Sequence, residues 1–130
     1  MENFYILAFT SGSNSAGSDG SHAVRVRAAG QTRSILLPNL PGDDYERNKG
    51  DLWKLTFSGN FGFSGCVTKS SIEYVYIDAA DNDGWNIDSI VTYVGAPGNG
   101  FMELTQDFNV FRWIDSNGEA SHLHFRLRIV

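Results

Sequence analysis

Four short loops rich in Asp, Asn and Gly could place several oxygen ligands around one hard cation. The loops span residues 13–19, 38–44, 81–85 and 115–118. Carboxylates, Asn side-chain carbonyls and the backbone carbonyls of Gly-containing loops are the ligands that Ca²⁺ prefers. The first three loops are more complex than hairpin turns, so they predict a calcium site. The fourth contains Asn117-Gly118, which is instead a strong hairpin signal.

Between these loops lie eight or nine short segments with β-strand character. Residues 23–28 alternate apolar and basic side chains, as a half-exposed strand does, and residues 4–10 form a continuous apolar run. No convincing amphipathic helix is visible. Regularly spaced strands and turn signals predict an all-β fold, an antiparallel eight-stranded β-sandwich formed by one domain over residues 1–130. Segments 110–114 and 122–129 are expected to form a hairpin within it.

Composition excludes several classes of protein. Hydrophobic residues make up 42% of the chain and charged residues 19%, which is enough for a packed core. A net charge of −5 argues against nucleic acid as a partner. Cys66 is the single cysteine, so no intramolecular disulfide can form, and we expect a buried or inert thiol. No apolar run approaches the length of a membrane span, and no secretory leader is visible.

Four blocks of sequence, in order and together covering most of the chain, resemble those of a known family. Residues 84–90, GWNIDSI, are close to a G-W-F-L-D-S-V/I element, the most specific of the four. Residues 16–20 resemble an A-G-T-D/S element, residues 43–51 an F-E-R-G-x-x-D element, and residues 108–114 an F-x-x-N-R-W-L element. These elements are typical of the PLAT family (also called LH2), found in lipoxygenases, pancreatic-type lipases, polycystins and clostridial phospholipase toxins. The resemblance implies a PLAT/C2-like β-sandwich, although the spacer 58–71 is longer than expected between two core strands.

The resemblance also implies a set of metal ligands. Members that bind Ca²⁺ take ligands from the loop after the first strand, the loop before the F-E-R-like element, and the residue just before the G-W-like element. The corresponding positions are Gly17 (backbone carbonyl), Ser18, Asp19, Asn39, Gly42 (backbone carbonyl), Asp43, Asp44 and Asp83. Ser15 occupies a position that is often acidic, which weakens one potential site. Many members have lost Ca²⁺ binding, but this chain keeps its four aspartates together.

Turn formation is the alternative role for these loops, because Asp, Asn and Gly favour tight turns through local hydrogen bonds and positive φ. Calcium is favoured because loops at one end of a sandwich meet. Unneutralised carboxylates there repel each other by about 1 kcal/mol or more per close pair, and a dication removes that repulsion. An EF-hand is excluded, since Gly84 follows Asp83 at once and Thr92 stands where a bidentate Glu is needed.

Four aromatic side chains are candidates for contact with a membrane or a partner: Tyr45, Phe61, Phe63 and Trp85. Phe61 and Phe63 flank a glycine in a Ser/Gly-rich loop, where they could form an exposed patch or pack over one end of the sandwich. Trp85 could insert into lipid, but its place between a loop and a strand favours a position in the core.

Other constellations are weaker. His122 and His124 share one face of an expected strand and could bind Zn²⁺ only with a third ligand. Five arginines on neighbouring strands could form a basic stripe: Arg25, Arg27, Arg33, Arg126 and Arg128. Such a stripe could bind acidic headgroups or glycans, although a solvated strand face is favoured. No nucleophile–base pair, hydrolase elbow or phosphate loop can be argued from the sequence.

These features predict a non-catalytic calcium-binding module that docks onto membrane lipid or a protein partner through its loop end, with a glycan as a further ligand class. The alternative is a structural, storage or defence/toxin-accessory protein in which Ca²⁺ only stabilises the fold, or a carbohydrate-binding sandwich. The resemblance slightly favours a secreted location, whereas the free cysteine and the lack of a visible signal do not.

Overall fold

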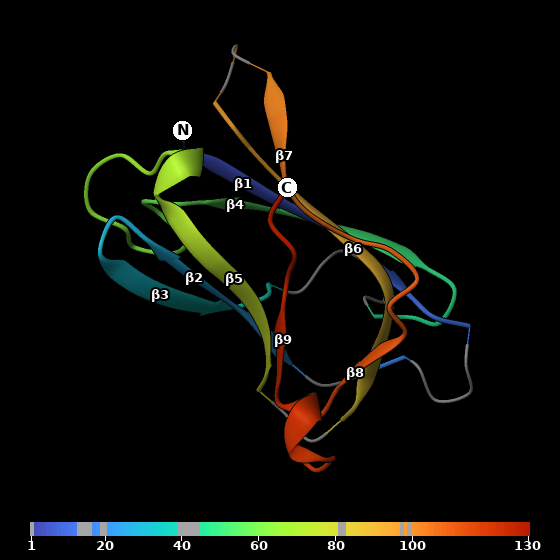
Figure 1. The fold of residues 1–130 in the computed structure, drawn as a ribbon. Coiled ribbons are helices and arrows are strands. Elements are labelled where there is room, and N and C mark those ends of the chain that lie inside the picture. Colours follow the sequence, from blue (N-terminus) through green and yellow to red (C-terminus); the bar gives the residue numbers. More distant parts are fainter. Residues whose placement is uncertain are drawn as a thin grey trace.

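The computed structural model describes residues 2–12, 17–18, 21–38, 45–80, 83–96, 98 and 100–130. Within these residues, nine β-strands form two antiparallel sheets that face each other (Figure 1). Sheet A contains β1 (Asn3–Thr10), β4 (Gly50–Thr56), β6 (Trp85–Gly95), β7 (Phe101–Asp107) and β8 (Arg112–Ile114). Sheet B contains β2 (His22–Ala28), β3 (Gln31–Leu36), β5 (Ile72–Ala79) and β9 (His124–Arg126). The expected antiparallel β-sandwich is therefore confirmed.

Strands from the N-terminal half of the chain occur in both sheets: β1 and β4 in sheet A, and β2 and β3 in sheet B. Sheet A runs β4-β1-β6-β7, with β8 pairing the start of β6, and sheet B runs β3-β2-β5-β9. Two short 3₁₀ turns, η1 (Lys69–Ser71) and η2 (Ala120–His122), precede β5 and β9. Within the described residues, no helix is long and apolar enough to cross a membrane.

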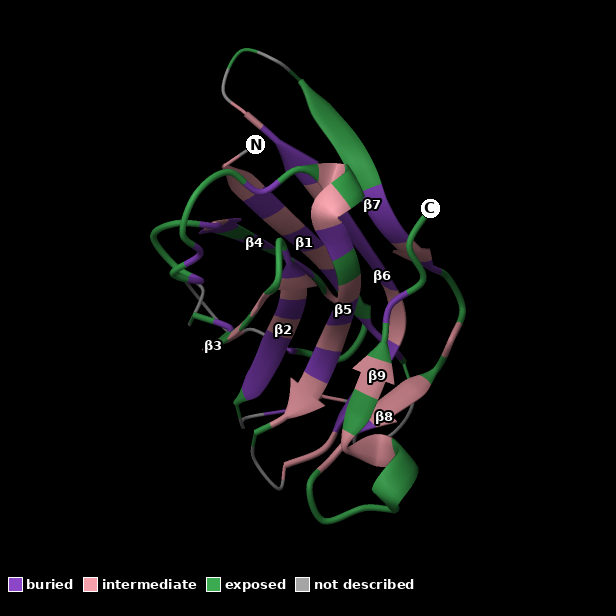
Figure 2. Cartoon of the chain, turned by 60° about the vertical axis from the view of Figure 1, so that its left-hand side comes forward, coloured by how far each residue is buried: buried purple, intermediate pink, exposed green. Residues whose placement is uncertain are grey.

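Alternation along the strands explains how the core forms. In β1 the side chains of Phe4, Ile6 and Ala8 are buried, while the intervening residues face outward. The same period of two appears as alternating bands of burial along β1, β2 and β5 in Figure 2. The two inner faces thus form one contiguous hydrophobic core.

The long spacer 58–71 folds back over one end of this core. Phe61 and Phe63 are both buried, and the Phe61 ring lies 5.6 Å from the Phe4 ring, centroid to centroid. Phe57 and Phe63 make a further edge contact at 5.9 Å. The prediction that Phe61 and Phe63 contact a membrane or a partner is therefore wrong, because these rings close the end of the sandwich.

The expected hairpin between segments 110–114 and 122–129 is also wrong. β8 pairs with β6 in sheet A, whereas β9 pairs with β5 in sheet B. The Asn-Gly loop still turns the chain, since the backbone N–H of Asn117 donates to Asp115 Oδ1 (2.9 Å). It does so where the chain crosses from one sheet to the other, so the fourth acidic loop has turn chemistry without a two-strand hairpin.

Two smaller expectations also change. Cys66 is exposed, not buried, because it lies in the surface part of the spacer. His122 belongs to η2 and not to the strand that contains His124, so the two imidazoles do not share a strand face.

Candidate functional site

Three of the predicted ligand loops come together at Ser18. Its backbone N–H donates to the carbonyl oxygen of Tyr45 (3.0 Å), the residue that follows the second loop. Its Oγ donates to the carbonyl oxygen of Asp83 (3.1 Å), which is 65 positions away in the sequence. Gly17 permits this approach, because a Cβ there would stand only 3.0 Å from the Tyr45 carbonyl oxygen. The loop ends are therefore joined by main-chain and hydroxyl contacts.

The structure describes three of the eight predicted metal ligands: Gly17, Ser18 and Asp83. The other five lie outside the described residues: Asp19, Asn39, Gly42, Asp43 and Asp44. Among the residues that the structure describes, no three His, Cys, Asp or Glu side chains group closely enough to hold a metal ion. The calcium site thus stays a prediction. One of its predicted ligands, the Ser18 hydroxyl, contacts His22 Nε2 at 3.0 Å.

Tyr45 anchors the end of the second acidic loop in an unusual backbone conformation. Its φ of +56° lies in the left-handed region, which bulky side chains rarely adopt. Asp51 Oδ2 accepts a hydrogen bond from the Tyr45 backbone N–H (2.9 Å), and Ser18 holds the carbonyl on the other side. Asp51 is buried and lies 3.7 Å from Lys49 Nζ. Within the block that resembles F-E-R-G-x-x-D, Asp51 therefore fixes the backbone of Tyr45, the residue that follows the second loop.

Next to the Ser18 junction lies a buried aromatic floor formed by His22, Tyr45, Trp53 and Trp85. The Tyr45 ring lies 4.7 Å from Trp85 and 5.5 Å from Trp53, and His22 lies 4.8 Å from Tyr45. Trp85 Nε1 donates to Thr10 Oγ1 (2.8 Å), which satisfies the buried indole. Neither Tyr45 nor Trp85 can therefore contact a membrane or a partner as predicted, because both rings are buried; Trp85 has the core position that its place in the sequence favoured.

Asn86 provides a test of whether this end suits a hard cation. The side chain is buried, and its Nδ2 donates to the carbonyl oxygen of Phe111 (3.2 Å). Within the described part of the chain, its Oδ1 has no hydrogen-bond partner. A buried acceptor without a donor calls for a water or an ion. Of the described predicted ligands, Ser18 and Asp83 offer a hydroxyl and a carboxylate oxygen, and oxygen donors of this type fit Ca²⁺.

Sequence reasoning missed two exposed aromatic side chains at this end. Phe108 and Phe111 are 57% and 55% exposed. Phe111 has φ of +47°, and the preceding Val110 N–H donates to the carbonyl oxygen of Asp88 (2.8 Å). Tertiary hydrogen bonds thus hold a bulky residue in a strained conformation that leaves its ring in solvent. The sequence signal was an F-x-x-F spacing at the start of the block 108–114, of which only Phe111 lies in the expected strand 110–114.

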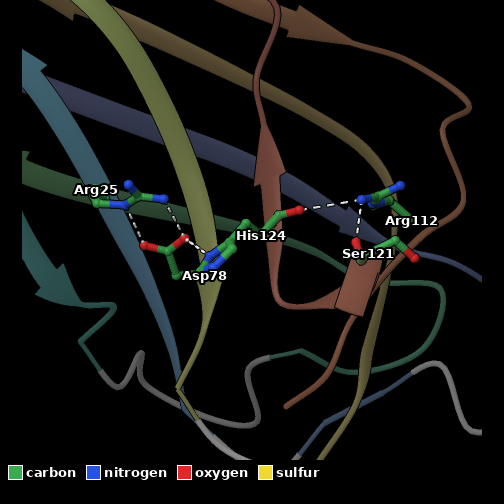
Figure 3. A network of polar contacts seen from close by, with 5 residues as sticks. All are labelled: Arg25, Asp78, Arg112, Ser121 and His124. Carbon is green, nitrogen blue, oxygen red and sulfur yellow. Dashed lines mark hydrogen bonds and ion pairs between the residues drawn. The ribbon is translucent and has the colours of Figure 1, made fainter. Parts of the chain in front are cut away.

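The outer face of sheet B holds a separate polar network, drawn in Figure 3. Arg25 donates to Asp78 through Nε (2.8 Å) and Nη2 (3.1 Å), and His124 Nδ1 lies 2.7 Å from Asp78 Oδ1. The hydrogen bond to Asp78 raises the pKa of Arg25 despite partial burial. Further along the chain, Arg112 donates to the carbonyl oxygens of Ser121 and His124.

This network modifies the expected basic stripe. Arg27 forms an ion pair with Glu73 (2.9 Å), just as Arg25 does with Asp78. Arg33 lies opposite Val26, and therefore on the core side of its edge strand, where it donates to the carbonyl oxygen of Gly62 (3.3 Å). The arginines therefore lie on different sides of sheet B, and Arg25 and Arg27 are neutralised within the chain.

Comparison with known proteins supports the fold. No family model matches the sequence, and no curated protein matches it significantly. Among solved structures, the alpha toxin from Clostridium absonum matches 98% of this chain with a TM-score of 0.72 and 18% identity. The Clostridium perfringens alpha-toxin from an avian strain matches with a TM-score of 0.73 and 17% identity, again over 98% of this chain.

Coral 8R-lipoxygenase gives a third match, with a TM-score of 0.62 and 13% identity over 98% of this chain. Its structure is described in terms of calcium activation via a C2-like domain. The chain spans only 31% of each alpha-toxin and 17% of the lipoxygenase. These neighbours come from two of the protein classes in which PLAT domains occur, so they agree with the resemblance seen in the sequence.

Proposed function

We propose that this chain is a non-catalytic module that binds Ca²⁺ at its loop end and docks through that end onto membrane lipid or a protein partner. The observation that carries the proposal is the junction at Ser18, which ties the ends of three acidic loops together. We expect the carboxylates of loops joined in this way to repel one another. A dication bound between them would relieve that repulsion and would make the loop end more positive.

The proposed ligands are the eight predicted from the sequence: Gly17, Ser18, Asp19, Asn39, Gly42, Asp43, Asp44 and Asp83. Bound Ca²⁺ would supply positive charge and coordination positions for oxygens of a lipid phosphate or a partner carboxylate. The chain's own residues prepare the site. Asp51 and Ser18 fix Tyr45 at the end of the second loop, and the Tyr45 ring packs in the buried aromatic floor.

Phe108 and Phe111 are the proposed contact residues, in place of the four aromatic side chains that are buried. Both rings are exposed, and Asn86 connects the Phe111 backbone to the start of β6, close in sequence to Asp83. Exposed aromatic rings beside a neutralised acidic surface could enter the interfacial region of a bilayer, where amphipathic and aromatic groups gain from burial. The calcium activation described for the coral lipoxygenase supports a similar role here.

Thermal unfolding tests the calcium part of this proposal. A site half-saturated at a hundredth of the free Ca²⁺ concentration should stabilise the fold by about 2.7 kcal/mol. We expect this shift with Ca²⁺, a smaller one with Mg²⁺, and none with chelator. Asp44→Ala/Asp83→Ala should lose it, whereas Glu73→Gln, an exposed acid on sheet B, should keep it. An equal shift in the double variant and in the wild type would contradict the assignment of ligands.

Calcium that only stabilises the fold is the second candidate, and one observation favours it. Four predicted contact side chains, Tyr45, Phe61, Phe63 and Trp85, lie in the core and not at the surface. Co-sedimentation with phosphatidylserine-containing vesicles separates the two roles. Docking predicts vesicle binding that needs Ca²⁺ and is weakened by Phe108→Ser/Phe111→Ser. A calcium-dependent rise in stability without binding to vesicles or to a protein partner would favour the structural role.

A further inference from the structure

The outer face of sheet A gathers apolar side chains from its four long strands. Exposure reaches 43% for Phe9, 44% for Leu52 and 60% for Phe101. The Phe101 ring lies 4.8 Å from the ring of Tyr5, which also faces outward. A shallow hollow of about 360 Å³ lies between Tyr5, Leu52, Lys54, Tyr93 and Phe101. Contiguous apolar surface of this kind marks an interaction site on a folded domain.

One row of residues across this face carries opposite charges at its two ends. Lys54 on β4 lies opposite Tyr5 on β1, and Tyr5 lies opposite Tyr93 on β6. Tyr93 in turn lies opposite Glu103 on β7. Directly paired residues point to the same side of a sheet, so the row reads Lys, Tyr, Tyr, Glu. Its ends are about 14 Å apart, three times the spacing between strands.

The neighbouring row has an apolar centre. Leu52 lies opposite Leu7, and Leu7 lies opposite Val91. Val91 is followed by Gln106 on β7. The two rows together place apolar or aromatic side chains on the central strands β1 and β6. Only the first row ends in charged side chains, Lys54 on β4 and Glu103 on β7.

From this pattern we propose that the outer face of sheet A binds a second copy of the chain. The two-fold axis would run parallel to the strands, between β1 and β6. Rotation about that axis exchanges the two ends of each row, so Lys54 faces the partner's Glu103 and Tyr5 faces the partner's Tyr93. In the next row Leu7 faces the partner's Val91, which is already largely covered within its own chain, and Leu52 faces the partner's Gln106. Every contact occurs twice, as an isologous interface requires.

The size of this face suits such a dimer. A fully covered aromatic side chain buries about 150–250 Å², so a half-exposed one offers roughly 100 Å². The outward residues comprise Tyr5, Leu7, Phe9, Leu52, Lys54, Tyr93, Phe101 and Glu103. Phe9, Leu52 and Phe101 are near half-exposed, whereas Tyr5, Leu7 and Tyr93 are less exposed. Together the eight side chains offer roughly 500–600 Å² per copy, the small end of specific interfaces, which suits a weak dimer.

Charge favours a second copy over other occupants. An anionic membrane would attract Lys54 but repel Glu103. The same face of a second copy, related by the two-fold axis, instead places an opposite charge against each of them. The interface also leaves the loop end uncovered, so dimer formation does not depend on calcium binding. A two-fold pair would present two loop ends, which raises avidity for any surface that both can reach.

Sedimentation velocity of the full chain, from micromolar to near-millimolar concentration, tests the dimer. We expect a monomer–dimer equilibrium whose Kd weakens about tenfold or more in Leu52→Glu. Leu36→Glu is the matched control, since Leu36 is a 55% exposed leucine on the edge strand of sheet B. A wild-type chain that stays monomeric throughout, or an equal effect of both variants, would overturn the proposal. Circular dichroism confirms that each variant is folded.

Charge reversal and cross-linking test the register. Lys54→Glu or Glu103→Lys should each weaken the dimer, and the double variant should recover most of the lost affinity. In mixed ¹⁴N and ¹⁵N chains, a zero-length carbodiimide link should join Lys54 to the partner's Glu103. A dimer that lacks this link and shows no recovery in the double variant would contradict the two-fold arrangement.

Discussion

The outer faces of the two sheets differ in whether their charged side chains pair within the chain. On sheet B, the Arg25 guanidinium contacts Asp78 and lies 4.4 Å from the centroid of the Tyr76 ring, and Arg27 pairs with Glu73. On sheet A, Lys54 and Glu103 stand on opposite edge strands with two tyrosines between them. The outer face of sheet B thus pairs Arg25 and Arg27 with carboxylates of the same chain, whereas sheet A presents apolar surface and separated charges.

This difference indicates which contacts stabilise the folded chain and which are available for association. Ion pairs and cation–π contacts that cross β2, β5 and β9 contribute to the stability of the monomer. Exposed side chains such as Leu52 and Phe101 contribute less to that stability than core residues do, because about half of their surface stays in water. Substitutions on the two faces should therefore separate stability from association.

The largest expected effect is on sheet B. Asp78→Ala removes the carboxylate that accepts two hydrogen bonds from Arg25 and contacts His124. Since hydrogen bonds to charged groups contribute about 1.5–3 kcal/mol when well protected, we expect a loss of about 2 kcal/mol, measured by urea unfolding.

The matched substitution on sheet A is Glu103→Ala. Glu103 is exposed and contacts Gln106, so the free energy of unfolding of the monomer should change by less than about 0.5 kcal/mol. Equal losses in Asp78→Ala and Glu103→Ala would remove the distinction between the two faces.

A moderate effect is expected from the tyrosines. Tyr76→Leu removes a ring that the Arg25 guanidinium covers, and should destabilise the monomer by about 1 kcal/mol. Tyr93→Leu, on the outer face of sheet A, should leave the monomer nearly unchanged but weaken self-association. Urea unfolding at low concentration and sedimentation at high concentration measure the two effects separately. The reverse pattern would contradict the comparison.

The smallest expected effect concerns pH. Burial raises the pKa of Asp107, although the Arg128 backbone N–H donates to its Oδ2 (3.0 Å). A raised pKa in the folded state means that stability from this group is present below its ordinary pKa and is lost as pH rises through the folded value. Asp107→Asn should therefore be at least as stable as the wild type at neutral pH. The gap should close on acidification, measured as urea unfolding against pH; a gap that widens in acid would contradict this sign.

Sequence patterns predicted the strands well, because their signal is local. The alternation of Val24 and Val26 with Arg25 and Arg27 is enough to define one inward and one outward face. The convergence of the acidic loops also followed from the sandwich itself, since its end brings the loops at residues 17–18 and 83–84 together. Ser18 makes that junction through contacts to Tyr45 and Asp83.

Longer-range choices could not be predicted in the same way. The sequence around Phe61 and the sequence around Phe108 do not indicate which ring is buried. Phe61 is buried because its ring packs against those of Phe4 and Phe57. Phe111 is exposed because tertiary hydrogen bonds fix a backbone conformation that its own sequence disfavours. The Asn-Gly turn likewise indicates a change of direction but not which sheet each flanking strand joins.

Terbium luminescence is the measurement that tests the calcium site most directly. Trp85 follows Asp83 closely at the start of β6, so Tb³⁺ bound in the loops should be sensitised by excitation of the tryptophan. We expect emission that Ca²⁺ suppresses by competition, that is lost in Asp83→Asn, and that persists in Glu73→Gln. Absence of sensitised emission in the wild-type chain, or equal emission in Asp83→Asn, would contradict a calcium site at the loop end.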